Sequence, residues 1–203
     1  MPSDAILGSV PLVNRDPWEM DISLLEDGAN EALARWTRAL IGSGPAGAHP
    51  ALPQEVAREL AEQGPVAIGV WVDGESVVQE MGGGDGSWAE GMQALATAHL
   101  PAVRLPEGQR GYVAFAVGHD PVELNFREGT PERRELCSNI HRGMWGLHAT
   151  FDDRSEWISP FEVIMKNRGF RVLVEELGKA MEVPASVFQE RVELVRWKTH
   201  HMV

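Results

Sequence analysis

The chain has 203 residues, of which 43% are hydrophobic and 24% charged, a composition typical of a globular protein with a sizeable core. Its 30 acidic residues outnumber 18 basic ones, and the formal net charge of -12 repels nucleic-acid phosphates and anionic lipids. The densest basic stretch, residues 127–134, is itself interrupted by Glu128 and Glu132. We therefore expect neither nucleic acid nor membrane as a partner.

A single cysteine, Cys137, rules out a disulfide within the chain and indicates a reducing compartment. The N-terminal residues lack the basic start and long apolar run of a signal peptide, and no apolar run reaches the roughly 18 residues that a membrane span requires. The sequence predicts a cytoplasmic protein.

The first half of the chain predicts helices followed by a hairpin. Residues 1–20 are expected to form a tail, and 21–203 a single α/β domain. Ser23 is expected to cap a first helix that ends near Leu40, and a second helix is expected over residues 54–63. Alternating valines and the turn dipeptide Asp73-Gly74 predict a β-hairpin over 66–81.

A glycine-rich run, residues 82–86, follows this hairpin. Ser87 and Glu90 have the spacing of a capping box, which predicts a helix over 88–100. Strands are expected over 112–117 and 122–126, and the charged residues 127–135 are expected to be exposed.

The last third predicts a second hairpin with strands 145–151 and 157–159, joined by the four residues 152–155. Helices are expected over 160–167 and 170–181, and a strand near 192–195 ends the chain. Four side chains of the 170–181 helix are expected to point inward: Val172, Leu173, Leu177 and Met181. We predict an α/β (α+β) fold with a mixed, mainly antiparallel sheet, flanking helices and one or two lobes.

The late segment resembles the AMMECR domain, an α/β domain of bacteria, archaea and eukaryotes. Residues 142–147 read RGMWGL where that family has R-G-x-D-G-L, a proline follows the return strand at Pro160, and residues 179–184 read KAMEVP where the family has K-A-G-L-P. The resemblance covers about residues 28–200. It implies an accessory or modifying role, because AMMECR-type proteins look linked to Memo-type dioxygenase-like proteins and radical SAM enzymes.

The chain departs from the family pattern on the first hairpin. Where the family reads Leu-Arg-Gly-Cys-Ile-Gly, residues 77–82 read VVQEMG, so Glu80 replaces the family cysteine. Trp145 stands where the family has aspartate. The chain also has no CxxxCxxC motif, so it is not itself a radical SAM enzyme.

The glycines of residues 82–86 are a candidate binding site, because glycine lets backbone N–H groups approach a ligand at the start of a helix. No GK[ST] follows, so the run is not a P-loop, and Asp85 would repel phosphate. The more common interpretation of such a run is a tight connection between hairpin and helix. We name Gly82, Gly83 and Gly84 as candidate ligand-binding residues.

Cys137 and His141 are four residues apart, and on a helix an imidazole so placed could hold the thiol as a thiolate. A buried structural cysteine is the more common outcome. Among the histidines and carboxylates, His119, Asp120 and Glu123 lie close together, but no spacing matches a known metal motif. We expect no metal and no cofactor.

Tryptophan is unusually frequent, with 7 against a single tyrosine. Trp71 points away from the valine face of the first hairpin, into either a second core layer or a ligand cleft. Trp145 joins an aromatic platform to the polar His141 and Arg142. We count Trp71, Trp145 and His148 as candidate ligand-binding residues, and expect His200 and His201 to lie in a frayed C-terminus.

Two hypotheses follow for the function. In the first, the chain is a binding or accessory protein that holds a small molecule, a peptide or a partner protein in a cleft between lobes, with a homodimer among the assemblies considered. In the second, it is a small cofactor-independent enzyme acting on an anionic or carbonyl substrate. His141 would then be the acid/base, Arg142 the charge stabiliser, and Glu80 or Cys137 a second catalytic group.

Overall fold

The computed structural model describes residues 24–138, 144–165 and 169–202. The expected N-terminal tail and the expected cap Ser23 lie outside these residues. The described elements are α1 (Asp27–Ser43), α2 (Gln54–Glu59), β1 (Gln63–Val72), β2 (Glu75–Ser87), α3 (Trp88–His99), a 3-10 turn η1 (Leu100–Ala102), β3 (Gly111–Glu123), α4 (Pro131–Cys137), β4 (Trp145–Phe151), β5 (Arg154–Ile158), α5 (Pro160–Met165), α6 (Phe170–Ala180), α7 (Ala185–Arg191) and β6 (Glu193–Met202).

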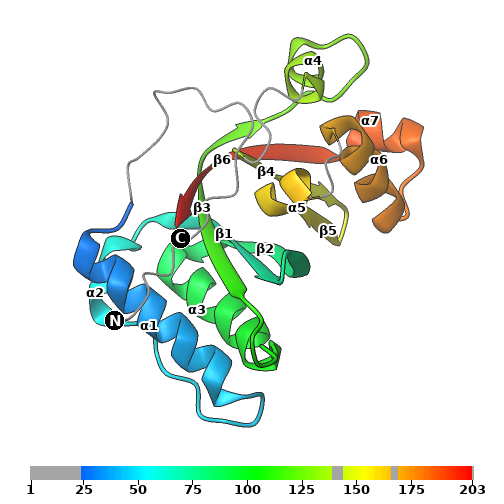
Figure 1. Cartoon of the computed structure of the whole chain (residues 1–203). Coiled ribbons are helices and arrows are strands. Elements are labelled where there is room, and N and C mark those ends of the chain that lie inside the picture. Colours follow the sequence, from blue (N-terminus) through cyan, green and yellow to red (C-terminus); the bar gives the residue numbers. More distant parts are fainter. Residues whose placement is uncertain (1–23, 139–143, 166–168, 203) are drawn as a thin grey trace.

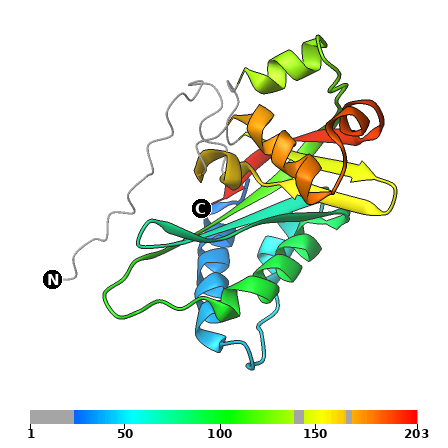
Figure 2. The same cartoon turned by 90° about the vertical axis from the view of Figure 1, so that its right-hand side faces the viewer.

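The six strands form one sheet in the order β2-β1-β3-β6-β4-β5, and every neighbouring pair is antiparallel. The edge strands β2 and β5 also contact one another, so the sheet curls until it is nearly closed. Figure 2 shows the β4–β5 hairpin lying across from β2. The predicted α+β fold with a mainly antiparallel sheet is confirmed, and every neighbouring pair of the described strands is antiparallel.

Helices cover the outer face of this curled sheet in two groups. Leu194 and Met202 are eight residues apart on β6, an even number, so both side chains leave the same face. Met202 joins the core beneath α1, α2 and α3, and Leu194 joins the core beneath α4, α6 and α7. Figure 1 shows the two groups at opposite ends of the sheet.

The inner face holds a smaller cluster built mainly from alanines and aromatic rings. Phe161 of α5 is 3% exposed and reaches into this face, between the strands of the first hairpin and the last strands. Small side chains on β1 and β3 leave room there for the large rings. The cluster consists of Ala67, Met81, Ala114, Ala116 and Phe161, with the partly buried Trp71, Tyr112, Trp157 and Trp197 packed against it.

The first hairpin forms as predicted. Asp73 and Gly74 both have positive φ, 50° and 83°, which a type I′ turn requires. The Asp73 side chain also accepts a hydrogen bond from the Arg110 backbone N–H at 3.0 Å, which ties the turn to the start of β3.

The second hairpin forms with a shorter turn than predicted. Phe151 pairs with Arg154, so only Asp152 and Asp153 make the turn, and the expected four-residue connection is wrong. Asp152 has a φ of 54°, a left-handed conformation that aspartate tolerates better than most residues. Two residues of the expected loop therefore belong to β5.

Three other expectations for the helices are corrected. The second helix ends at Glu59, because Gln63 already pairs in β1. Residues 131–137, expected to be only an exposed charged segment, form α4, whose N-cap Thr130 accepts a hydrogen bond from Arg133 N at 3.4 Å. In α6, Val172 is 41% exposed and does not point inward.

The C-terminal strand is longer and more central than expected. His200 pairs with Val117 and His201 with Ala116 of β3, so both histidines lie in β6. The expected fraying is wrong, because the ladder with β3 continues to Met202.

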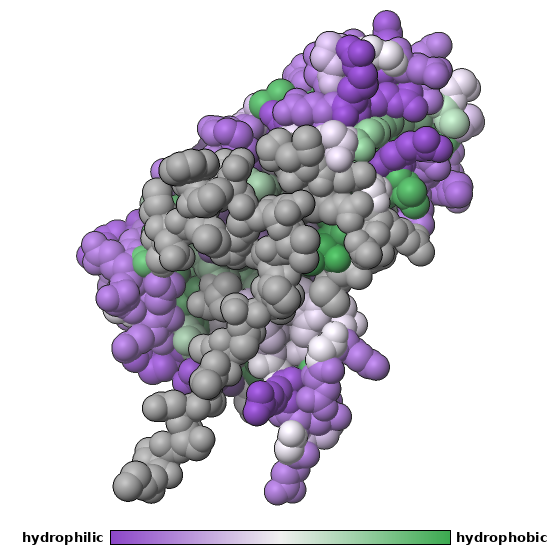
Figure 3. Space-filling view, turned by 45° about the horizontal axis from the view of Figure 1, so that its top comes forward, coloured by the Kyte–Doolittle hydropathy of each residue, from purple (hydrophilic) through white to green (hydrophobic). Residues whose placement is uncertain are grey.

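The surface shows few apolar side chains. Figure 3 shows one face on which hydrophilic atoms dominate the described residues and apolar atoms form small separate spots. The exposed large apolar side chains are Val77, Leu105, Val122 and Val172. Within the described part of the chain, no helix is both long and apolar enough to span a bilayer.

Candidate functional site

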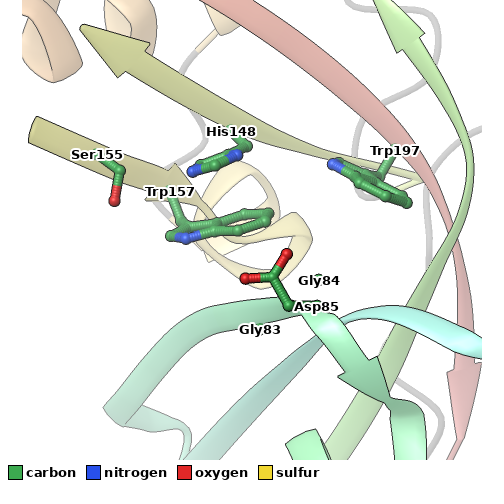
Figure 4. A pocket seen from close by; sticks show the side chains of 7 residues that line it. All are labelled: Gly83, Gly84, Asp85, His148, Ser155, Trp157 and Trp197. Atoms are coloured by element: carbon green, nitrogen blue, oxygen red, sulfur yellow. The ribbon is translucent and has the colours of Figure 1, made fainter. Parts of the chain in front are cut away.

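A cavity of about 270 Å³ opens where the end of β2 faces the β4–β5 hairpin. It collects two aromatic rings, an imidazole, a carboxylate, a hydroxyl and bare backbone from four different strands (Figure 4). The lining residues are Gly83, Gly84, Asp85, His148, Ser155, Trp157 and Trp197. Convergent polar groups on an aromatic lining are typical of ligand sites.

A bulge in β2 forms one wall of the cavity. Pro65 pairs with Gly83 and Gln63 with Ser87, so the single β1 residue Gly64 faces the three β2 residues 84–86. Gly84 has a φ of 127° and Gly83 a φ of 85°, which side-chain-bearing residues rarely adopt. Bulges often redirect a side chain next to a binding site. Here the carboxylate of Asp85 points toward the β4–β5 hairpin (Figure 4).

A stacked pair of rings forms the opposite wall. His148 of β4 and Trp157 of β5 are cross-strand partners, with ring centroids 3.9 Å apart and planes only 10° from parallel. Figure 4 shows the Trp157 indole between the imidazole of His148 and the carboxylate of Asp85. One face of the indole is therefore covered by His148, and the other is turned toward Asp85.

The imidazole of His148 is held neutral. Burial lowers the pKa of His148, and the negative charge of Asp85 opposes this shift only in part. At neutral pH the ring therefore carries no charge and offers one donor and one acceptor nitrogen. Asp85 is the one acidic side chain among the residues that line the cavity.

Trp197 of β6 brings an unsatisfied donor to the site. Its indole nitrogen Nε1 is buried and has no hydrogen-bond partner in the described structure. Leaving such a donor unpaired costs about 1–3 kcal/mol. Trp197 lines the cavity, and the nitrogen edge of its ring is turned toward His148 (Figure 4).

The candidate ligand-binding residues from the sequence fall into two sets. Gly83, Gly84 and His148 line the cavity, and Gly82 lies one residue before its edge. Trp71 lies in the inner core, where its ring lies over Gly69 and meets Phe161 edge-on at a centroid distance of 5.6 Å.

Trp145 lies apart from the cavity, in the outer core. It is only 4% exposed, and the Arg196 guanidinium lies 4.2 Å from its ring centroid. This ring packs beneath α6, and the structure does not bring it to the His148 side of the hairpin, because neighbouring even and odd residues of β4 face opposite sides.

Of the candidate catalytic residues, the structure describes Glu80 and Cys137, and it does not bring these two together. Glu80 pairs with Ile68, so its exposed side chain leaves the outer face, away from the cavity. Cys137 is the last residue of α4, and burial raises the pKa of its thiol, against the smaller opposing effects of Arg133 and Arg171. His141 and Arg142 lie outside the described residues.

Four lining residues were absent from the sequence candidates: Asp85, Ser155, Trp157 and Trp197. The sequence of the second turn contains a signal that could have identified Trp157. A four-residue connection would have paired His148 with Ser159, whereas the observed two-residue turn pairs it with Trp157. Recognising the left-handed tolerance of Asp152 would have placed this imidazole on the indole.

The histidines expected near carboxylates make local contacts. His119 stacks on His200 with centroids 4.3 Å apart, and its Nδ1 lies 3.2 Å from the Asp120 carboxylate. Over the described residues, no group of three or more histidine, cysteine or acidic side chains has a geometry that could hold a metal ion.

A scan against protein-family models finds no match, and neither does a search of curated proteins. Among solved structures, the chain is similar to uncharacterized protein PH0010 from Pyrococcus horikoshii, with a TM-score of 0.65 and 18% sequence identity. The likeness covers 88% of this chain and 92% of that one. It shows that the two chains share a fold.

Proposed function

We propose that this chain is a small-molecule binding protein with an accessory role, which holds its ligand between the β2 bulge and the β4–β5 hairpin. One observation carries the proposal: the carboxylate of Asp85 and the stacked His148–Trp157 pair come from opposite edges of the sheet and line one cavity. A carboxylate, an imidazole and a free indole face offer a bound molecule both orientation and contact area.

The size of the cavity favours a small molecule over a protein partner. The cavity measures about 270 Å³ and is lined by seven residues. That space accommodates a compact metabolite or a single side chain of a peptide. A protein partner would need a much larger contact area, of about 800 Å² on each side.

The AMMECR-type kinship is a further part of this proposal. It is supported by the sequence at the second hairpin and by the sequence at the end of α6. Arg142 and Gly143, which precede the hairpin, lie outside the described residues. An accessory role fits a chain that has Glu80 where the family has its cysteine.

The enzyme hypothesis gains no comparable support. Glu80 and Cys137 lie on elements that belong to different parts of the fold, and the raised pKa of the Cys137 thiol disfavours the thiolate that nucleophilic attack requires. These observations support a binding role as our proposal over catalysis.

A thermal-shift screen of metabolites tests the proposal with two matched variants. Ser155→Trp places a large ring on the face of β5 that lines the cavity. Glu156→Trp places the same ring one residue further along β5, on the opposite face of the strand. We expect compounds that raise the Tm of the wild type and of Glu156→Trp but not that of Ser155→Trp. Stabilisation that survives Ser155→Trp, or a screen without any stabilising compound, would contradict the proposal.

A further inference from the structure

We infer that the ligand of this cavity is a flat organic cation, such as an amidinium, a guanidinium or a protonated nitrogen ring, which lies on Trp157 with its charge against Asp85. This inference rests on the proposed function and adds the chemical class of the ligand. Three features of the cavity support it: the unpaired carboxylate of Asp85, the uncovered face of the Trp157 ring, and the wall formed by the backbone of Gly83 and Gly84.

The first feature is an unpaired carboxylate. Among the described residues Asp85 has no ion-pair partner, whereas Asp120, another acidic residue at a sheet irregularity, lies 3.7 Å from the Lys198 ammonium. The other lining groups are uncharged at neutral pH, because burial keeps His148 neutral. The cavity therefore carries a net negative charge, which a cationic ligand would neutralise.

The second feature is the aromatic surface beside that charge. A cation over an indole face is attracted by the ring quadrupole, and tryptophan is the strongest of the aromatic side chains in this respect. His148 stacks on one face of Trp157 and fixes the ring, so the other face is presented to a ligand without loss of side-chain freedom. Trp197 supplies a second ring at the far side of the cavity.

The third feature favours a flat shape. Gly84 contributes only backbone, and no atom lies within 4 Å of the position that a Cβ would occupy there. A planar group can therefore lie between the backbone of the bulge and the plane of Trp157. A planar amidinium or guanidinium could also donate two parallel hydrogen bonds to the carboxylate of Asp85.

The charge of the whole chain acts in the same direction. The formal net charge of -12 raises the local concentration of cations and lowers that of anions. An anionic ligand would meet both this field and Asp85, and no Lys or Arg lines the cavity to compensate.

Benzamidine, benzamide and benzoate provide a direct test. The three compounds have nearly the same planar shape but are a cation, a neutral molecule and an anion at neutral pH. By isothermal titration calorimetry on the full chain we expect benzamidine to bind at least about tenfold more tightly than benzamide, and benzoate not to bind. Raising the salt concentration should weaken benzamidine binding.

Two variants on β2 distinguish a specific effect of the Asp85 carboxylate from the effect of removing any one negative charge. Asp85→Asn should remove the preference for benzamidine over benzamide, whereas Glu80→Gln, the same charge change on the outer side of the same strand, should preserve it. If Asp85→Asn does not fold, as judged by its far-UV circular dichroism, Trp157→Leu tests the aromatic contribution instead and should weaken benzamidine binding by about tenfold.

The outcomes distinguish this inference from the proposed function. Equal or tighter binding of benzamide or benzoate, absence of benzamidine binding, or an unchanged preference in Asp85→Asn would overturn the cationic ligand class. The comparison of Ser155→Trp with Glu156→Trp tests the binding function independently of ligand charge. If a neutral metabolite binds and only Ser155→Trp blocks it, the cationic ligand class is wrong and the binding function is supported.

Discussion

Asp85 reaches the cavity because two residues before it can adopt backbone conformations that are closed to most side chains. Gly83 and Gly84 both have positive φ, and the extra residues of the bulge carry the chain away from the regular ladder. The nearby space would accept a side chain at Gly84, so the requirement for glycine there is one of backbone conformation and not of packing.

Substitution of Gly84 tests this requirement. Gly84→Ala should lower the free energy of unfolding by about 1–3 kcal/mol, because alanine at a φ of 127° is strained. Gly28→Ala is the control: it lies in α1 with no atom within 4 Å of its Cβ position, and should be neutral or stabilising by up to about 1 kcal/mol. Urea unfolding measures both, and equal effects of the two substitutions would refute the bulge argument.

His148 gives the stability a pH dependence. Because its pKa is lowered in the folded chain, protonation favours the unfolded state, so stability is highest above the ordinary pKa of 6.5 and falls as the pH is lowered through it. Between about pH 7.5 and pH 5 the wild type should lose more stability than His148→Gln. Solvent that reaches the half-buried ring keeps this difference below about 1 kcal/mol. Equal losses in urea unfolding would show that His148 is not perturbed.

At the scale of the elements, the capping box of α3 holds the end of the bulge. The Ser87 hydroxyl accepts a hydrogen bond from Glu90 N at 3.2 Å, and the Glu90 carboxylate accepts one from Ser87 N at 2.9 Å. Ser87 is also the residue at which β2 resumes pairing with β1. One short motif therefore both starts the helix and ends the bulge that positions Asp85.

Replacement of the N-cap Ser87 should lower the free energy of unfolding. Ser87→Ala removes the side-chain acceptor and should reduce the free energy of unfolding by about 1 kcal/mol, whereas Ser87→Thr keeps the hydroxyl and should cost much less. Chemical denaturation compares the two. If Ser87→Thr is as destabilising as Ser87→Ala, the hydroxyl of the cap is not the stabilising group.

Local signals in the sequence predicted the elements where one motif decides the conformation. Asp73-Gly74 and the Ser87–Glu90 box are such motifs, and both form as expected. The short helix α7 was missed because Phe188 is its sole fully buried residue, so it has no apolar period. Its packing also explains Gly178, where a Cβ would lie 3.0 Å from the Phe188 ring.

The candidate site was harder to predict, because the closure of the sheet assembles it. Gly83, Gly84 and His148 carried local signals, a glycine run and a polar ring beside a hairpin. Asp85 meets Trp157 only because the edge strands β2 and β5, far apart in sequence, contact one another. No local pattern reports such a contact, and the length of the second turn, which decides that His148 stacks on Trp157, depends on a single left-handed aspartate.

At the scale of the whole molecule, the last strand joins the two halves of the fold. β6 pairs with β3 on one side and β4 on the other, and it contributes side chains to both outer cores and to the cavity. The position of Trp197 relative to Asp85 therefore depends on the pairing of this strand along its full length.

Met202 tests the contribution of the far end of β6. It is 3% exposed and pairs with Phe115 in the core beneath α1, α2 and α3, so Met202→Ala should cost about 2–5 kcal/mol. Lys198→Ala on the same strand removes only an exposed ion pair and should cost less than about 1 kcal/mol. Thermal and urea unfolding compare them, and a Met202→Ala loss no larger than that of Lys198→Ala would show that the end of the strand frays.

The proposed binding function requires a ligand in the cavity between Asp85 and Trp157. The indole N–H signals in a nitrogen–proton correlation spectrum report on its binding directly. The chain has 7 tryptophans, whose signals can be assigned with single Trp→Phe variants. On titration with benzamidine, or with a compound from the thermal-shift screen, we predict shifts of the Trp157 and Trp197 signals and none of Trp36, whose N–H donates to Pro50 O at 2.9 Å in the outer core. Unchanged Trp157 and Trp197 signals at saturating ligand, or shifts centred on Trp36, would show that the ligand does not bind in this cavity.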